Sequence, residues 1–533
     1  MQPYSAQSCP ETRIYDLLNE ALEQRADLTR QIDELSIRRD QIRQQIGQYR
    51  ERLSPIRKIS SDILRHIFEW CLPAMNTLTD HSVAPLLLMQ VCGLWREVAL
   101  STPSLWTSFD ITFLHRPDLT SPRGLRSGFI PTTRIDQWIR RSGALPLTIS
   151  INICSSLQND ANLHAVHLYA SIVQCSKRWQ NITLRVPRSW LQCWISLSAA
   201  DVPMLKTFSQ WDVTNPPQPD DTHNLWNSLQ ILATETLREV DLRMIQAEGF
   251  HVTQPPDLRF ADNLSYVCLD SPYITVSNVW NILSRFPHLE KCDFSIYGRG
   301  GTSSWIESAT LTLPRLTSFK LQVNTRYSLL NFFFLFSKLL LPKITNFEYR
   351  GNSPPSAVWD AARHCLNVPK LSLEFRHLLD PNLRKYLLGN LHIQNLKIFE
   401  ISMNHELLRD LLLIPDTTNT ELILCPYLRT LELNDLYMAL SVSLIEMLKE
   451  HHGSTKYGRP RFQELCLRFS RSLPSHIMEE FETLRSTSNL RIAVSSVPTP
   501  GVSNTYGDCT ITNVVTKGIA RTMQSGLSLY VQV

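Results

Sequence analysis

The sequence predicts a multidomain protein in which a long N-terminal helix precedes a small all-α module and an irregular α/β solenoid. Three observations predict this fold class. The first fifty residues carry a heptad pattern, the next fifty hold short apolar helices, and the remainder repeats one apolar phrase. At 533 residues the chain exceeds one ordinary hydrophobic core, so several domains or one elongated body are expected.

The long helix is predicted over residues 14–53, after a disordered start at residues 1–13. Alternating steps of four and three residues from Ile14 to Leu53 land on apolar side chains, with Arg25 and Arg39 as the exceptions. A heptad seam sustained for more than five repeats is typical of a coiled coil. The seam includes Leu18, Leu28, Ile32, Leu35, Ile42 and Ile46.

The seam could pair with a second copy of the chain or cover part of its own chain. Arg25 and Arg39 both fall at heptad position a, where a parallel homodimer would place each arginine against its own counterpart. A polar residue at this position fixes the register, while facing like charges weaken the pair. The alternative is an ordinary amphipathic helix that folds back onto the chain. The sequence leaves both possibilities open.

Residues 54–108 predict a small helical module. Ser54-Pro55 ends the long helix, and Ser60 or Ser61 can cap a new one with Asp62 in its first turn. Two or three short helices cannot enclose a large core, so a partner is expected to cover part of their apolar surface. The apolar residues at helical spacing are Ile63, Leu64, Ile67, Phe68, Cys71 and Leu72, then Leu87, Val91, Leu94, Trp95 and Val98.

This pattern resembles the F-box, the module by which substrate receptors bind the Skp adaptor of cullin–RING ubiquitin ligases. The family motif L-P-x-E-L/I-L-x-x-I-F corresponds to residues 59–68, ISSDILRHIF, and its V-C-x-x-W corresponds to residues 91–95, VCGLW. Ser60 replaces the usual proline, and residues 75–84 form a longer spacer than is usual. The resemblance implies that the adaptor is bound by Ile59, Ile63, Leu64, Ile67, Phe68, Leu72, Val91 and Trp95.

A longer stretch, from Ile14 to Ile149, is similar to F-box proteins expanded in mushroom-forming (basidiomycete) fungi. The shared phrases are PIR at residues 55–57, VCGLWREVALSTPSLW at residues 91–106 and WIRRSGALPLTI at residues 138–149. Trp95 and Trp106 are also expected to attach the module to the next domain. Residues 109–144 are interpreted as a linker segment.

Residues 145–494 repeat a phrase of the form apolar-x-x-apolar-x-apolar at intervals close to those of leucine-rich repeats. A proline precedes six copies by two residues, which predicts strands entered from proline turns and followed by returning segments. A solenoid similar to leucine-rich repeats is therefore expected, with residues 495–533 as a tail or closing segment. The copies begin at Trp179, Leu205, Leu237, Leu264, Leu289, Leu316, Ile344, Val368, Leu396, Leu428 and Phe462.

Residues between the apolar ones of the phrase would face outward and could recognise a ligand. Their signs are mixed, so they give no electrostatic indication of what that ligand is. The candidates are Arg238, Lys291, Lys320, Glu348, Glu400, Arg429 and Glu432.

The sequence contains no recognisable catalytic, cofactor-binding or metal-binding motif, so no enzyme activity, cofactor or metal is expected. A formal charge of +4 without a basic stripe disfavours nucleic acid. The most apolar run, residues 329–342, is too short to span a membrane. The protein is expected to be intracellular, cytoplasmic or nuclear, and not secreted.

The resulting hypothesis is a substrate-recognition subunit of a Skp–cullin–F-box (SCF) ubiquitin ligase. Its partners would be a Skp-family adaptor, through it a cullin–RING ligase, an unknown substrate protein, and a second copy bound through the long helix. The alternative is a scaffold that interacts through its coiled coil and repeats without a ligase.

Overall fold

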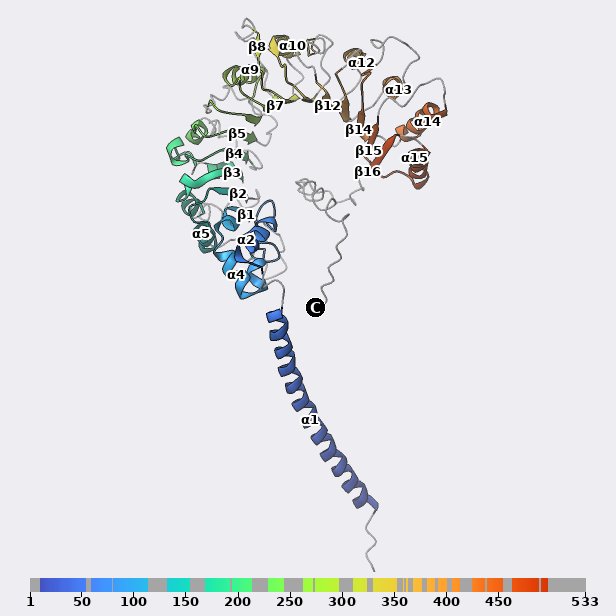
Figure 1. Cartoon of the computed structure of the whole chain (residues 1–533). Helices are drawn as coiled ribbons and strands as arrows, with labels where there is room; N and C mark the ends of the chain where they lie inside the picture. Colours follow the sequence, from blue (N-terminus) through green and yellow to red (C-terminus); the bar gives the residue numbers. More distant parts are fainter. Residues whose placement is uncertain are drawn as a thin grey trace, which may run out of the picture. The chain divides into compact units, whose positions relative to one another are not determined.

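The computed structural model divides the chain into two units, Met1–Phe208 and Ser209–Val533 (Figure 1). The residues that the structure describes are 10–53, 59–78, 80–113, 132–153, 168–191, 194–212, 229–243, 262–271, 274–296, 310–323, 329–351, 358, 361–362, 368–375, 381–388, 392–399, 405–412, 424–436, 439–453, 463–487 and 490–496. Half of the predicted linker at residues 109–144, namely residues 114–131, and all but the first two residues of the predicted tail lie outside these ranges.

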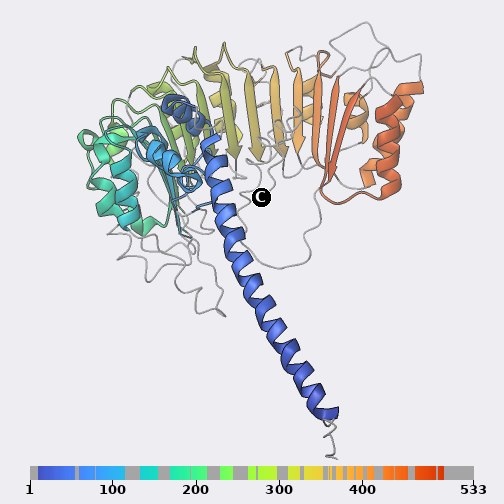
Figure 2. The same cartoon turned by 60° about the horizontal axis from the view of Figure 1, so that its bottom comes forward.

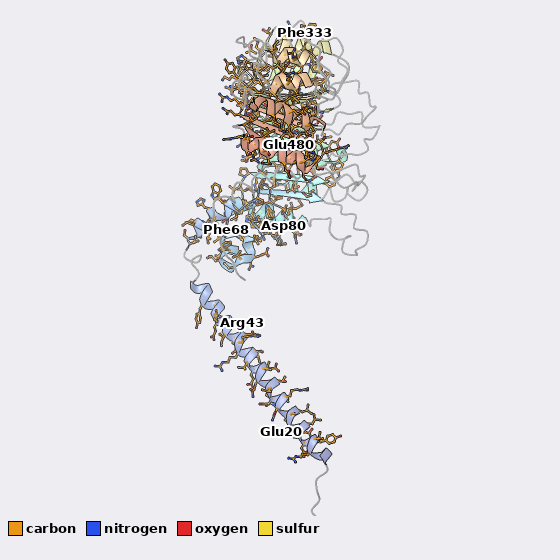
Figure 3. All side chains as sticks on the ribbon, turned by 90° about the vertical axis from the view of Figure 1, so that its right-hand side faces the viewer. Glu20, Arg43, Phe68, Asp80, Phe333 and Glu480 are labelled. Carbon is orange, nitrogen blue, oxygen red and sulfur yellow. The ribbon has the colours of Figure 1, made fainter. Side chains whose placement is uncertain are left out.

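The first unit begins with helix α1 (Pro10–Leu53), which starts four residues before the predicted Ile14 and ends where the heptad pattern ends. Figure 3 shows its side chains, Glu20 and Arg43 among them, along the length of the helix. From Arg13 to Tyr49 nearly every side chain is exposed, including all six named seam residues. The structure therefore leaves the apolar seam uncovered.

A helical module comes next, and a parallel sheet begins directly after it. The helix predicted across residues 87–98 is broken at Cys92, whose backbone is extended, so α3 and α4 are separate. Strand β1 pairs with β2 and β2 with β3, so the sheet begins before residue 145. The elements are α2 (Ser61–Trp70), α3 (Leu88–Val91), α4 (Gly93–Leu100), η2 (Pro103–Trp106), β1 (Ser108–Phe113), α5 (Thr132–Arg141), β2 (Leu147–Ile153), η5 (Ser176–Arg178), β3 (Trp179–Val186), α7 (Arg188–Leu191) and η7 (Ala199–Asp201).

Part of the spacer at residues 75–84 lies against strand β1. Asn76 is buried, and its side-chain amide donates to the carbonyl oxygens of Leu105 (3.2 Å) and Ser108 (2.8 Å). The backbone carbonyl of Asn76 accepts a hydrogen bond from the backbone amide of Asp110 at 2.7 Å. The next residue, Thr77, forms a parallel β-bridge with Asp110. Asn76 and Thr77 therefore connect the module to β1.

The second unit is an irregular α/β solenoid-like body whose parallel strands pair in chain order (Figure 2). Strand β4 (Thr207–Asp212) crosses the boundary between the units. The later strands of the sheet are β5 (Glu239–Arg243), β6 (Tyr266–Asp270), β7 (Lys291–Ile296), β9 (Ser318–Val323), β11 (Asn346–Gly351), β12 (Lys370–Phe375), β13 (Asn395–Phe399), β14 (Thr430–Leu436), β15 (Glu464–Phe469) and β16 (Arg491–Ser496).

Returning helices cover one face of this sheet (Figure 1). Their apolar sides pack on the strands. The ring centre of Phe336 on α10 lies 6.0 Å from that of Phe347 on β11. The ring centres of Phe347 and Phe319, on neighbouring strands, lie 5.7 Å apart. The elements are η8 (Gln230–Ala233), α9 (Val276–Arg285), α10 (Leu329–Lys338), α12 (Pro381–Leu387), α13 (His405–Leu412), α14 (Ala439–Gly453) and α15 (Ser475–Thr487), with the short strand pair β8 (Leu311–Thr312) and β10 (Leu339–Leu340).

Proline turns lead into several strands, as the repeated phrase predicts. At Pro203, Pro287, Pro342 and Pro426 the apolar residue that opens the phrase donates its amide to the carbonyl three residues back, at 3.0 to 3.3 Å. Proline fixes the backbone angle that the second residue of such a turn requires. Each of these turns therefore leads into the following strand at the same point of the repeated phrase.

One repeat copy lies three residues from its predicted place. The phrase predicted to begin at Leu396 begins at Ile393, because Leu396 pairs with Leu371 and Ile398 with Leu373. Ile393, Leu396 and Ile398 are buried. Because Phe399 and Ile401 extend the apolar pattern, two alignments fit the sequence equally well, and only strand pairing distinguishes them.

Candidate functional site

Helix α2 is apolar on two faces, and only one of them is buried. Leu64 and Phe68 are 1% and 0% exposed, whereas Ile63, Ile67 and Trp70 are 55%, 39% and 90% exposed. The exposed residues are spaced i, i+4 and i+7, so they share one side of the helix. Ser60 caps the helix by accepting a hydrogen bond from the Ile63 amide at 3.4 Å. The three exposed residues Ile63, Ile67 and Trp70 are called the α2 stripe below.

The buried face of α2 forms the core of the module. The ring centre of Phe68 lies 4.9 Å from that of Trp95 on α4 (Phe68 is labelled in Figure 3). The Ser104 hydroxyl donates to Glu69 at 2.6 Å and ties η2 to α2. Leu64 and Phe68, which the resemblance placed among the adaptor contacts, therefore face inward and are covered by the module's own core.

Three further exposed apolar residues lie on the next two helices. Leu87 and Val91 lie at the two ends of α3, and Leu94 lies in the first turn of α4. Of the remaining predicted residues, Ile59, Leu72 and Trp95 are half-buried. Trp70, Leu87 and Leu94 were not among the predicted adaptor contacts. The spacing of Trp70 from Ile63, and of Leu87 and Leu94 from Val91, could have indicated them as candidates.

Trp106 attaches the module to the next segment, as predicted, while Trp95 stays within the module. The fully buried Trp106 donates its ring N–H to the Ala99 carbonyl at 2.9 Å, and its ring centre lies 4.7 Å from that of Trp138. The Arg141 guanidinium lies 4.6 Å over the Trp106 ring. The phrase at residues 138–149 therefore has a structural role at this junction.

A second candidate site lies in the second unit, on the sheet face opposite the helices. Because side chains alternate along a strand, every second residue faces this side. The strand pairing aligns these residues in rows, and the middle row reads Asp241, Cys268, Asp293, Lys320, Glu348, Ser372, Lys397, Glu432 and Cys466.

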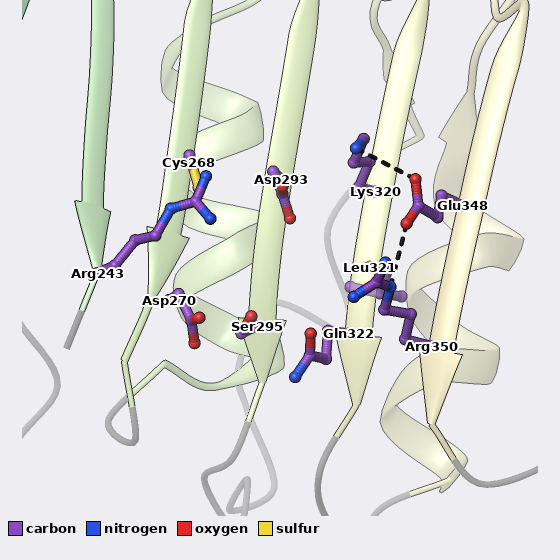
Figure 4. A pocket seen from close by; sticks show the side chains of 10 residues that line it. All are labelled: Arg243, Cys268, Asp270, Asp293, Ser295, Lys320, Leu321, Gln322, Glu348 and Arg350. Carbon is purple, nitrogen blue, oxygen red and sulfur yellow. Dashed lines mark hydrogen bonds and ion pairs between the residues drawn. The ribbon is translucent and has the colours of Figure 1, made fainter. Parts of the chain in front are cut away.

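A hollow of about 200 Å³ opens on this face between β5 and β11 (Figure 4). Of the predicted recognition residues, Lys320 and Glu348 line it, whereas Glu400 lies outside the described residues. The alternation of side chains along each strand could have indicated the other residues that line the hollow. The lining residues are Arg243, Cys268, Asp270, Asp293, Ser295, Lys320, Leu321, Gln322, Glu348 and Arg350.

Ion pairs fix most of the charges of the hollow. Lys320 lies 3.1 Å from one Glu348 oxygen, and Arg350 lies 3.1 Å from the other (Figure 4). Arg350 also pairs with Glu374 at 3.0 Å. Arg243 pairs with Asp241 at 2.7 Å. These distances correspond to charge-assisted hydrogen bonds, which hold the side chains in fixed directions.

Asp293 differs from its neighbours in the hollow. Among the described residues it has no ion-pair partner, although Lys320 and Arg243 act on it at longer range. Burial raises the pKa of its carboxyl above the ordinary value, against the lowering effect of those two cations. Asp293 is therefore a half-buried acceptor able to receive a cationic or hydrogen-bond-donating group.

The described residues contain no cluster of side chains arranged to hold a metal ion. None of the described helices is long and apolar enough to cross a membrane. The two candidate functional surfaces are the α2 stripe and the polar hollow.

No protein-family model and no curated protein is significantly similar to this chain.

Proposed function

We propose that the protein is the substrate-recognition subunit of an SCF-type E3 ubiquitin ligase and is not itself an enzyme. In this proposal residues 54–108 are an F-box that binds a Skp-family adaptor, and the leucine-rich-repeat-like body binds a substrate protein. The ligase and the substrate would be held close together, and transfer of ubiquitin would be accelerated by proximity.

The observation that carries the proposal is the α2 stripe. A helix in so small a module uses Leu64 and Phe68 to close its core and still presents Ile63, Ile67 and Trp70 to solvent. Grooves that accept an amphipathic helix bind anchors at this spacing. Covering a large apolar side chain completely contributes about 1.5–3 kcal/mol, so burial of the area that these three residues still expose would favour docking.

The polar hollow is proposed as part of the substrate-binding face. Its charges are held in place by ion pairs, while Asp293 is left to pair with an incoming group. A fixed charge pattern favours one partner over others because like charges placed together are costly. The hollow therefore supports recognition of a polar surface that presents a cation, such as a lysine or arginine side chain.

The test is co-purification of the full chain with a Skp-family adaptor. The variant Ile63→Asp with Ile67→Asp should lose the adaptor, since both substitutions bring a charge onto the α2 stripe. A matched control is Leu340→Asp with Val442→Asp, which alters two equally exposed apolar residues of the second unit and should bind normally. Equal binding by the stripe variant would show that the docking assignment is wrong.

A second candidate function is a scaffold without a ligase. The uncovered seam of α1 favours it, because an interaction through this helix would serve such a role without the F-box. Sedimentation of the full chain with and without the adaptor separates the two. Self-association together with failure to bind any Skp-family adaptor would support the scaffold.

A further inference from the structure

We propose that two copies of the chain associate through α1 as an antiparallel coiled coil. The starting observation is the uncovered seam, whose residues Leu18, Leu28, Ile32, Leu35, Ile42 and Ile46 are between 44% and 64% exposed. A contiguous apolar row of this length on a soluble helix is expected to be covered by a partner. The charges of the helix indicate that this partner is a second copy, and they determine its direction.

The arginines of the seam disfavour a parallel pair. In a parallel homodimer each position a faces the same position of the other copy, so Arg25 would meet Arg25 and Arg39 would meet Arg39. Arg38 at position g would also meet Arg43 at position e of the second copy, twice in each dimer. A parallel pair therefore brings four like-charge contacts to one interface.

An antiparallel pair removes these contacts without shifting the helices. Position a then faces position d, and full overlap of the seam pairs residues whose numbers add to 67. Arg25 lies against Ile42, and Arg39 against Leu28, so the arginine stems can pack on apolar side chains while their charged ends reach water. Other pairs are Leu18 with Tyr49, Ala21 with Ile46, and Ile32 with Leu35.

The flanking positions agree with this arrangement. In the antiparallel pair Arg38 lies next to Gln31, and Arg43 next to Leu22, so neither meets another arginine. The two parts of the helix also differ in charge: residues 13–28 carry a net charge of −2 and residues 38–49 a net charge of +2. Antiparallel pairing places these opposite charges together, whereas parallel pairing places like with like. The charged residues are Arg13, Asp16, Glu20, Glu23, Arg25 and Asp27 in the first part, and Arg38, Arg39, Asp40 and Arg43 in the second.

The direction of pairing also determines where the two F-box modules and repeat bodies lie. A helix of 44 residues is about 66 Å long at ~1.5 Å per residue. In an antiparallel pair the two chains leave the coiled coil at opposite ends, whereas a parallel pair would release both at the same end. This inference depends on α1 alone and holds whether or not the chain binds a ligase.

The experiment uses the full chain and cysteine cross-linking. Two differently tagged variants, Ala21→Cys and Ile46→Cys, are mixed, treated with a short bis-maleimide and analysed by mass spectrometry of the linked peptides. Mass spectrometry separates the engineered cysteines from the native ones. The expected product links residue 21 of one copy to residue 46 of the other. A matched control mixes Glu23→Cys with Gln44→Cys, whose numbers also add to 67 but which lie at position f, away from the seam.

Sedimentation equilibrium of the unmodified chain should show a dimer, and the variant Ile32→Asp with Leu35→Asp should sediment as a monomer. The 21–46 link should exceed the 21–21 link at least tenfold, because copies of residue 21 would be about 37 Å apart. A dominant 21–21 link would overturn the proposal in favour of parallel pairing. A monomer at concentrations of tens of micromolar, or a dimer unaffected by the Asp substitutions, would overturn it as well.

Discussion

Phe68→Ala is predicted to destabilise the helical module strongly, although the sequence places Phe68 beside Ile67 in the same apolar stretch. Phe68 is 0% exposed and its ring packs on Trp95 at 4.9 Å. Replacing a buried phenylalanine with alanine typically costs about 3–5 kcal/mol. Whole domains are stable by only about 5–15 kcal/mol. This small module would therefore lose a large share of its stability.

The measurement is amide hydrogen exchange of the full chain, followed on peptides from residues 59–106. Because about 1.4 kcal/mol corresponds to a factor of ten, a loss of 3 kcal/mol speeds exchange of the best-protected amides about a hundredfold. Ile67→Ala is the matched control: its side chain is 39% exposed, so the expected cost is about 1 kcal/mol and the exchange rises less than tenfold.

Unchanged exchange in Phe68→Ala would refute this reasoning. It would mean that Phe68 contributes nothing to the core, and that the interior of the module is filled by other residues. Equal acceleration by Phe68→Ala and Ile67→Ala would contradict the division of α2 into a buried and an exposed face.

Two further predictions concern Gly351 and Asp293 of the second unit. Gly351→Ala should lower the free energy of unfolding by at least about 1–3 kcal/mol in denaturant titration, because its φ of +147° strains any other residue and a Cβ would overlap the Val323 carbonyl. Gly93→Ala, where a Cβ meets nothing within 4 Å, should change stability by less than about 1 kcal/mol; a similar loss in both would count against the argument. Asp293→Asn should raise the melting temperature at neutral pH. Burial raises the pKa of the Asp293 carboxyl in the folded protein above its value in the unfolded chain. The carboxyl therefore ionises first in the unfolded chain as pH rises, and the free energy of unfolding falls between the two pKa values. The variant should lose that part of the decline as pH rises above the ordinary carboxyl pKa, and an unchanged melting profile would contradict the assignment.

The regular elements could be predicted from the sequence because local patterns determine them. The heptad spacing predicts α1 to its last residue, and Ser60 with Asp62 predicts the start of α2. The proline turns predict where several strands begin. The break at Cys92 and the shift of one phrase to Ile393 could not be predicted, because apolar spacing alone allows a continuous helix in one place and two alignments in the other.

The surfaces depended more on tertiary structure than the elements did. The sequence by itself shows that residues 63–72 are apolar and that Arg25 and Arg39 interrupt the seam, since these are properties of order along the chain. Only packing decides that Phe68 turns inward while Ile63 and Ile67 remain outside, because both faces of the helix carry large apolar side chains. Only strand pairing brings Asp293 beside Lys320 and Glu348, residues 27 and 55 positions further along the chain.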